Sequence, residues 1–223
     1  MEINKNSQYT DYFNYYNQKD LETPQLIESK LQTFNHASDL ITKWYRKPRD
    51  GRNSNTPEQG REEKMLHCYE NKGNVKKLIG KGLELGFGLG TSTHWLLEKN
   101  NNIVLDGIDF QTNLQKIIPF LKELYGEKIG DYSIGDMQQI NKPDSYYDFI
   151  NSSSIWEHLT DEVYWNTLKE CYRVLKPQGK IYVYVDQSAP NIGEHIRVVG
   201  PEVTRREMES IGFKGLTNYV YRK

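Results

Sequence analysis

The sequence predicts an α/β fold built on a mostly parallel sheet with helices on both faces, together with a helical cap at the N-terminus. Three observations support this prediction. Short apolar runs alternate with helical patterns from Gly82 onward. A strand-like run passes through a glycine-rich turn into a helical pattern within residues 81–95, KGLELGFGLGTSTHW. Residues 1–74 carry helical patterns, so they are expected to form a cap on a core of residues 75–223.

Each element of the core is predicted from an apolar run or a helical period bounded by turn residues. The expected strands cover residues 82–85, 103–108, 132–134, 147–151, 180–185 and 214–221. The expected core helices cover residues 91–99, 112–125, 161–174 and 204–211. In the cap, Thr23 and Pro24 favour the start of a helix over residues 24–45, and a second helix is expected over residues 57–70.

Composition and charge exclude several classes of protein. A length of 223 residues fits one domain or one domain plus a cap, and a net charge of −1 predicts binding neither to nucleic acid nor to an anionic membrane. No apolar run approaches the roughly 18 residues that a membrane span needs, and the polar N-terminus does not resemble a signal peptide, so a cytoplasmic location is expected. Cys68 and Cys171 form no Cys-x-x-Cys or Cys/His cluster, so neither a disulfide framework nor a metal site is indicated.

The glycine-rich turn indicates a ligand site. Gly86, Gly88 and Gly90 follow the apolar run that contains Glu84, and a Thr-Ser-Thr triplet opens the helical pattern. Alternate glycines allow positive φ angles and close approach of a ligand, and the first N–H groups of the helix are unpaired donors. The turn lacks the third glycine of a dinucleotide fingerprint and the Gly-Lys-Ser/Thr ending of a phosphate loop. A strand–helix turn without a ligand is the alternative.

The pattern acidic-x-G-x-G-x-G resembles motif I of the class I S-adenosylmethionine-dependent methyltransferases, whose ligand carries no phosphate. Three later stretches are similar to further motifs of that family: IGDMQQI at residues 134–140, YYDFINSSSIWEHL at residues 146–159 and CYRVLKPQGKIYVYV at residues 171–185. The last one resembles the small-molecule group called methyltransferase domain type 11, although Gln178 stands where glycine is usual. The resemblance covers residues 75–213 and implies the Rossmann-like class I methyltransferase fold.

The resemblance implies S-adenosylmethionine as the cofactor, with S-adenosylhomocysteine as its product. It places Glu84 near the methionine ammonium, Asp109 on the ribose hydroxyls and Asp136 on the exocyclic amine of adenine. Met137 is expected against the adenine ring. The full set of expected cofactor residues is Glu84, Gly86, Gly88, Gly90, Asp109, Phe110, Asp136, Met137 and Asn151. Asp109 also fits a helix N-cap, and the two roles are compatible.

The end of the sheet is expected to depart from the family. The family's sheet closes with an antiparallel hairpin of two strands, whereas the last segment, GFKGLTNYVYRK, leaves room for one strand. Either the seventh strand is missing or residues 191–199 supply an extra element.

The absence of several sequence motifs excludes some classes of methyl acceptor. Residues 151–154, Asn-Ser-Ser-Ser, replace the N/D-P-P-Y/F motif of enzymes that methylate amino groups of DNA bases. The chain has no Pro-Cys pair for cytosine C5 chemistry, no glutamate pair of the arginine methyltransferases and no acidic cluster of the metal-dependent catechol enzymes. These gaps leave a metal-free small-molecule acceptor or a peptide acceptor. His158 is the expected general base, and a structural role at a helix start is the alternative.

The acceptor pocket is expected to combine the cap with the segment after strand 147–151. Because only 18 residues, 186–203, join the fifth strand to the last helix, the N-terminal segment is expected to close over the cofactor. Tyr12, Tyr16 and Trp44 are the expected pocket residues of the cap, and Ser153 and Trp156 those of the core. Aromatic packing without substrate contact is the alternative for each aromatic.

The sequence therefore predicts methyl transfer to an O or N atom of a small metabolite or natural-product intermediate. Two other functions stay open: methylation of a peptide or protein acceptor, and a non-catalytic cofactor-binding subunit. Neither a nucleic acid nor a membrane is expected as a partner, and no oligomeric state is predicted.

Overall fold

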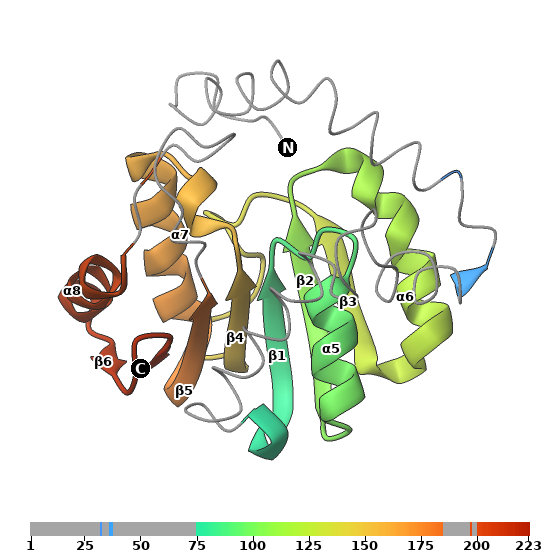
Figure 1. The fold of residues 1–223 in the computed structure, drawn as a ribbon, viewed down its shortest axis with the longest axis horizontal. Coiled ribbons are helices and arrows are strands. Elements are labelled where there is room, and N and C mark those ends of the chain that lie inside the picture. The colour runs from blue at the N-terminus through green and yellow to red at the C-terminus, as the bar shows by residue number, and fades with distance from the viewer. Residues whose placement is uncertain (1–31, 33–35, 38–74, 185–196, 198–199) are drawn as a thin grey trace, which may run out of the picture.

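The computed structural model of the protein describes residues 32, 36, 37, 75–184, 197 and 200–223 (Figure 1). The predicted cap helices over residues 24–45 and 57–70 lie outside the described residues, apart from positions 32, 36 and 37. The described part of the chain contains the expected α/β core.

The core is a seven-stranded sheet with the order β3-β2-β1-β4-β5-β7-β6 (Figure 1). The strands are β1 Gly80–Leu85, β2 Ile103–Asp109, β3 Ile129–Ile134, β4 Tyr147–Ser153, β5 Leu175–Tyr184, β6 Lys214–Gly215 and β7 Val220–Arg222. The first five strands pair in parallel, and β7 is antiparallel to both β5 and β6. The prediction of a mostly parallel sheet is therefore confirmed.

Helices and short 3₁₀ turns connect the strands of the described core. They are α5 Thr91–Lys99, α6 Ile118–Tyr125, α7 Asp161–Val174 and α8 Pro201–Ile211, with 3₁₀ turns η3 Val75–Lys77, η4 Thr112–Ile117, η5 Gly126–Lys128 and η6 Trp156–His158. At the start of α7, the Thr160 side chain accepts a hydrogen bond from the N–H of Val163. The helix predicted over residues 112–125 starts as a 3₁₀ turn, and α6 begins only beside Pro119, which favours a first turn.

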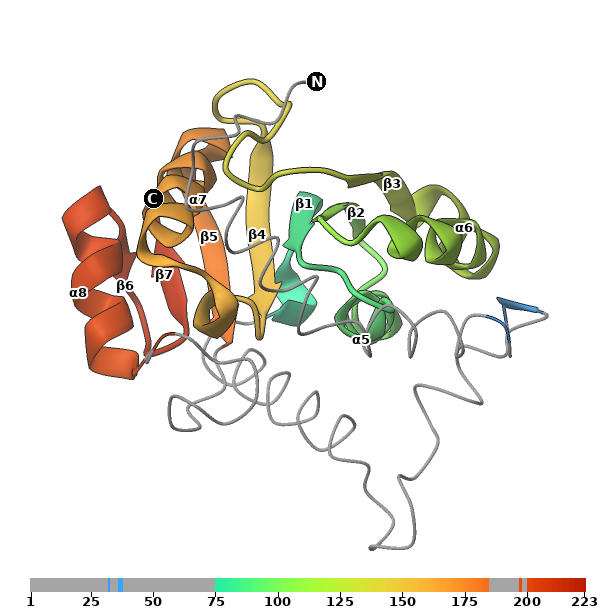
Figure 2. The same cartoon turned by 90° about the horizontal axis from the view of Figure 1, so that it is seen from above.

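Two apolar cores lie on opposite faces of the sheet, because successive strand residues point to opposite sides. On one face, Ile150 and Ile181 pack with side chains of α7 and α8. On the other face, Phe149 and Tyr182 pack with side chains of α5 and α6. The view from above shows α7 and α5 on opposite sides of the strands (Figure 2). Helices therefore cover both faces, as the sequence predicts.

The expectation of a single closing strand over residues 214–221 is wrong. The segment folds into the short hairpin of β6 and β7, because the N–H groups of Leu216 and Thr217 both donate to the Val220 carbonyl, at 2.9 and 3.1 Å. The Thr217 side chain also accepts a hydrogen bond from the N–H of Tyr219 at 3.1 Å. Since β6 needs two residues only, twelve residues suffice for both strands, and no element from residues 191–199 is required.

Strand β5 is longer than expected and contains the residue that departs from the family motif. It begins at Leu175, ahead of the predicted start at Lys180. Within it, Gln178 is exposed and has a φ of 67°, a conformation that glycine adopts at no steric cost. The Gln178 N–H donates to the Lys223 carbonyl at 3.0 Å, which fixes the backbone there. The departure at Gln178 therefore affects an exposed position, and it introduces backbone strain.

Candidate functional site

The expected cofactor residues of the core follow the carboxyl ends of neighbouring strands. Strands β1, β2, β3 and β4 are parallel, so their carboxyl ends meet at one edge of the sheet. The chain passes from β1 to β2 and β3, and then returns to β4 on the other side of β1 (Figure 1). Ligands of open α/β sheets bind at such a reversal of strand order. The edge beside β1 and β4 is therefore the candidate site.

The glycine turn after β1 takes the conformation that its sequence predicts. Gly86, Gly88 and Gly90 have φ angles of 65°, 48° and 78°. A Cβ atom on Gly86 would lie 2.4 Å from Cγ2 of Ile155, whereas a Cβ atom on Gly88 would have no neighbour within 4 Å. The first glycine thus allows close packing, and the second borders open space that a ligand can enter.

The first turn of helix α5 follows the glycine turn and contains N–H groups that precede the first intrahelical bond. Its N-cap, Gly90, has no side chain that could accept a hydrogen bond from the first turn. The His94 N–H donates to the Gly90 carbonyl at 2.8 Å, so the N–H groups of the three preceding residues come before the first intrahelical bond. The start of α5 can therefore donate to a polar ligand.

Glu84 is fully buried at the end of β1 and is held by three neutral side chains. It accepts hydrogen bonds from the hydroxyls of Ser92 and Thr93 and from the amide of Asn151. The Thr93 hydroxyl also lies 2.9 Å from the Tyr132 hydroxyl. Burial raises the pKa of Glu84 to about 7, although the three hydrogen bonds oppose this shift. Glu84 therefore ties the first turn of α5 to β4 and titrates close to neutral pH.

Several buried polar atoms near this edge lack a hydrogen-bond partner. The Asn151 amide nitrogen donates to Glu84 at 3.2 Å, but its oxygen has no partner. The side-chain oxygens of Gln111, just after β2, and Ser154, just after β4, are also buried and unpaired. Buried polar atoms are normally paired. These acceptors and donors fit a polar ligand that supplies the missing partners.

Asp109 ends β2 and approaches the glycine turn directly. Its two carboxylate oxygens accept hydrogen bonds from the N–H groups of Gly88, at 2.9 Å, and Gln111, at 3.1 Å. Burial raises the pKa of Asp109, and the hydrogen bonds to backbone N–H groups oppose the shift. A carboxylate has about four acceptor positions. The Phe110 N–H also binds this carboxylate, so backbone donors use most of its acceptor positions and one remains for a further donor. Phe110 itself is half-buried.

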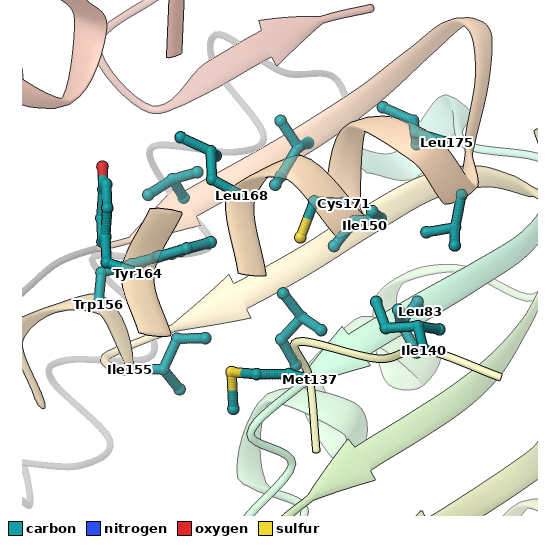
Figure 3. Close-up of a cluster of buried hydrophobic side chains, with 14 of the residues drawn as sticks. Leu83, Met137, Ile140, Ile150, Ile155, Trp156, Tyr164, Leu168, Cys171 and Leu175 are labelled. Atoms are coloured by element: carbon teal, nitrogen blue, oxygen red, sulfur yellow. The ribbon is translucent and has the colours of Figure 1, made fainter. Parts of the chain in front are cut away.

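Asp136 and Met137 follow β3 in a tight turn on the α7 face of the sheet. Asp136 is half-buried, and its carboxylate accepts the N–H of Gln138 at 2.8 Å. Met137 is buried and belongs to the apolar cluster that contains Leu83 and Ile140 (Figure 3). The structure thus anchors the turn through Met137 and leaves Asp136 nearer the surface.

The segment after β4 carries the remaining expected residues of the core. Ser153 is the last residue of β4 and is half-buried. His158 ends the 3₁₀ turn η6 and is also half-buried, and its backbone N–H donates to the Ile155 carbonyl at 3.1 Å. Ser153 thus ends the strand that pairs with β1, and His158 follows it by five residues.

The expected place of Trp156 on the pocket wall is corrected by the structure. Trp156 is fully buried, and its ring packs edge-on against Tyr164 of α7 at 5.3 Å between centroids (Figure 3). Its indole N–H donates to the Ser152 hydroxyl at 2.6 Å. Because β4 offers this buried acceptor and α7 offers an aromatic face, the indole is held in the core.

The other expected pocket residues, Tyr12, Tyr16 and Trp44, lie outside the described residues. Within the described part of the chain, no group of three or more His, Cys, Asp or Glu side chains could hold a metal ion. No helix among the same residues is long and apolar enough to cross a bilayer.

Three sets of residues around the site could not be identified from the sequence. The sequence predicts Ser92 and Thr93 only as part of a helix start, whereas their hydroxyls bind Glu84; a hydroxyl triplet after an acidic residue in a strand is the available signal. Tyr132 reaches Thr93 from β3, and a Cβ atom on Gly107 would lie 2.5 Å from the Tyr132 ring, so a glycine in β2 makes room for that ring. Gln138 and its contact to Asp136 had no sequence signal.

Comparison with known proteins agrees with this geometry. Residues 83–183 match the family model described as Methyltransferase domain, of the type 11 group. The uncharacterized methyltransferase YdaC of Bacillus subtilis is 30% identical over 101 residues, which are 44% of this chain and 51% of that protein. The chain thus covers about half the length of this curated relative.

Solved structures share the fold at lower identity. A 1,6-didemethyltoxoflavin-N1-methyltransferase of Burkholderia thailandensis has a TM-score of 0.59 at 17% identity, over 84% of this chain and 86% of that one. The [4+2]-cyclase SpnF has a TM-score of 0.60 at 18% identity, over 81% and 71%. A SAM-dependent methyltransferase of Archaeoglobus fulgidus has a TM-score of 0.55 at 21% identity, over 69% of each chain.

Residues 83–183 match the methyltransferase domain model, and the sheet has the fold of solved methyltransferases, so this part of the chain is similar to the class I S-adenosylmethionine-dependent methyltransferases. Within this class, the matched model is that of the type 11 group, which confirms the resemblance noted in the sequence. S-adenosylmethionine is the methyl donor of the class, so the predicted cofactor agrees with the match.

Proposed function

We propose that the protein transfers a methyl group from S-adenosylmethionine to an O or N atom of a small molecule. The observation that carries the proposal is the pairing of Asp109 with the glycine turn. The Gly88 N–H binds one carboxylate oxygen at 2.9 Å, which holds the carboxylate beside the open space at Gly88. An acidic side chain at the end of the second strand, beside the glycine turn, matches the residue that binds a ribose hydroxyl in nucleotide-binding α/β folds.

The other residues of the edge fit the rest of the cofactor. The unpaired oxygen of Asn151 and the partly satisfied carboxylate of Glu84 would accept from the methionine ammonium, and the first turn of α5 would donate to its carboxylate. Asp136 would accept from the exocyclic amine of adenine, with Phe110 and Met137 on the apolar side of the ring. When bound, the cofactor supplies an activated methyl group on a sulfonium.

His158 is the residue proposed to take a proton from the acceptor. It lies on the turn after β4, is half-buried, and belongs to the segment that borders the glycine turn. Methyl transfer in line with the sulfonium needs alignment of the acceptor and, for a hydroxyl or ammonium, removal of one proton. A neutral imidazole can accept that proton.

A small acceptor is supported by the names of structural neighbours. The Burkholderia thailandensis neighbour is an N1-methyltransferase whose structure contains 1,6-didemethyltoxoflavin and S-adenosylhomocysteine. The [4+2]-cyclase among the neighbours indicates that the fold also serves other reactions, so the acceptor must be found by experiment. A peptide acceptor, a non-catalytic cofactor-binding role and a cytoplasmic location stay predictions of the sequence.

Calorimetry with S-adenosylhomocysteine tests the cofactor site without knowledge of the acceptor. The wild-type chain is expected to bind this product, and Asp109→Ala is expected to weaken binding by about 1.5–3 kcal/mol, the contribution of hydrogen bonds to a charged group. Glu123→Ala, an exposed acidic position on α6, is the matched control and should bind as the wild type does. No binding by the wild-type chain would refute the proposed cofactor, and equal binding by Asp109→Ala would refute its ribose contact.

The acceptor class is tested with the methyl-labelled cofactor. Label should pass to members of a panel of small amines and hydroxyl compounds, and not to a panel of peptides. Transfer to peptides alone would replace the small-molecule proposal by the peptide alternative.

A further inference from the structure

The Gln138 side chain connects Asp136 to helix α7. Its amide nitrogen lies 3.3 Å and 3.2 Å from the two carboxylate oxygens of Asp136. Its amide oxygen accepts a hydrogen bond from the Asn166 side chain at 3.0 Å. These hydrogen bonds connect Asn166 of α7 to the Asp136 carboxylate through the Gln138 amide.

The chemistry of the two partners determines how the Gln138 amide is oriented. A carboxylate can only accept hydrogen bonds, so the Gln138 nitrogen must face Asp136. The Gln138 oxygen then faces Asn166, whose amide nitrogen donates to it. No other orientation satisfies both ends, and the amide therefore holds the carboxylate in one direction.

Helix α7 gives this connection a rigid support. Asn166, Glu170 and Arg173 are spaced four and three residues apart, so they lie on one side of the helix. Glu170 accepts the N–H of Ile140 at 3.0 Å, and Arg173 donates to the Ile140 carbonyl at 2.9 Å. Arg173 also donates to the carbonyl of Lys142 at 2.8 Å. The segment after β3 is thus held against α7 at several points, and Gln138 is the point nearest to Asp136.

We propose that Gln138 is a positioning residue for adenine recognition: its amide orients the Asp136 carboxylate toward the exocyclic amine of the adenine ring. This inference rests on the proposed function, because it takes Asp136 as the acceptor of that amine. The backbone N–H of Gln138 already binds one Asp136 oxygen at 2.8 Å. The side-chain amide adds the contact to both oxygens, which restrains rotation of the carboxylate and keeps its free acceptor positions aimed in one direction.

Calorimetry with two ligands tests the proposal. The first ligand is S-adenosylhomocysteine, and the second is its analogue with hydrogen in place of the exocyclic amine of adenine. Gln138→Ala is expected to bind the first ligand about 3- to 10-fold more weakly than the wild type, the effect of one hydrogen bond. Gln138→Ala is expected to bind the second ligand as tightly as the wild type does, because that ligand has no amine that could donate a hydrogen bond to Asp136. A purely structural role of Gln138 would weaken both ligands alike.

Two variants serve as controls. Gln139→Ala removes the neighbouring, exposed glutamine, whose side chain makes no described hydrogen bond, and should leave both affinities unchanged. Asn166→Ala removes the side chain of α7 that donates to Gln138. It should weaken binding of S-adenosylhomocysteine, but not of the analogue, and by a smaller factor than Gln138→Ala does.

The possible results separate the inference from the proposed function. Equal losses for both ligands, no loss, or tighter binding by Gln138→Ala would overturn the role of Gln138 while leaving the cofactor site intact. Failure of the wild-type chain to bind S-adenosylhomocysteine would overturn the proposed function and the inference together. Thermal unfolding of each variant shows whether a loss comes from incomplete folding.

Discussion

Replacing Glu84 with glutamine should change how the stability of the protein depends on pH. The Glu84 carboxyl is fully buried, and its described partners, Ser92, Thr93 and Asn151, are all neutral. Burial raises its pKa from 4.5 to about 7. Glu84→Gln keeps the size of the side chain and removes the titration.

The sign and size of the effect follow from the two pKa values. Between pH 4.5 and about 7, folded Glu84 retains a proton that the unfolded chain has already released. The stabilisation from this proton is complete below the unfolded pKa and is lost as the pH rises through the folded pKa. A shift of this size corresponds to about 3 kcal/mol in the free energy of unfolding.

Urea unfolding of the wild type and Glu84→Gln at several pH values between 5 and 8 measures the effect. The free energy of unfolding of the wild type should fall relative to that of the variant across this range, by up to about 3 kcal/mol. Groups that titrate in both proteins cancel in the comparison. The exposed control Glu123→Gln should give a difference from the wild type that stays constant with pH. A constant difference for Glu84→Gln as well would refute the reasoning.

Three further predictions concern catalysis and stability. His158→Ala should lower turnover by roughly 10²–10⁴-fold without changing the affinity for S-adenosylhomocysteine, and full activity between pH 6 and 9 would return His158 to a structural role. Gln178→Gly should raise the free energy of unfolding by about 1 kcal/mol, because glycine relieves the strain of a φ of 67°; an unchanged urea midpoint would contradict this. Asp106→Ala should lower the free energy of unfolding by about 1–3 kcal/mol, because it leaves the buried Tyr147 hydroxyl without its partner at 2.9 Å; an unchanged urea midpoint would contradict this.

The parts of the fold that depend on local pattern could be predicted from the sequence. Helices α5 and α7 begin and end at the predicted residues, because a glycine turn and the cap at Thr160 mark their starts. The glycine turn could be predicted for the same reason, since alternate glycines with positive φ angles are a local feature. Asp109 could be placed at the site because it ends a strand that runs parallel to β1.

Features that depend on contacts between distant residues could not be predicted in the same way. The strand-like pattern of residues 214–221 does not show that the chain reverses, because the reversal depends on one shared carbonyl at Val220. An aromatic residue after β4 fits a pocket wall as well as a core, and only the contacts to Ser152 and Tyr164 place Trp156 in the core. The link between Gln138 and Asn166 joins residues 28 positions apart through side chains alone.

The glycine in the middle of β2 has a consequence for how mutational data on this protein should be interpreted. Any side chain at Gly107 would displace the Tyr132 ring, and the Tyr132 hydroxyl lies 2.9 Å from Thr93 at the start of α5. A displaced ring would therefore disturb the helix start that borders the glycine turn. A screen of all substitutions for cofactor binding would therefore show Gly107 as intolerant, although Gly107 is not among the proposed ligand contacts. Positions that tolerate no substitution in this protein thus include residues that support the site as well as residues that touch the ligand.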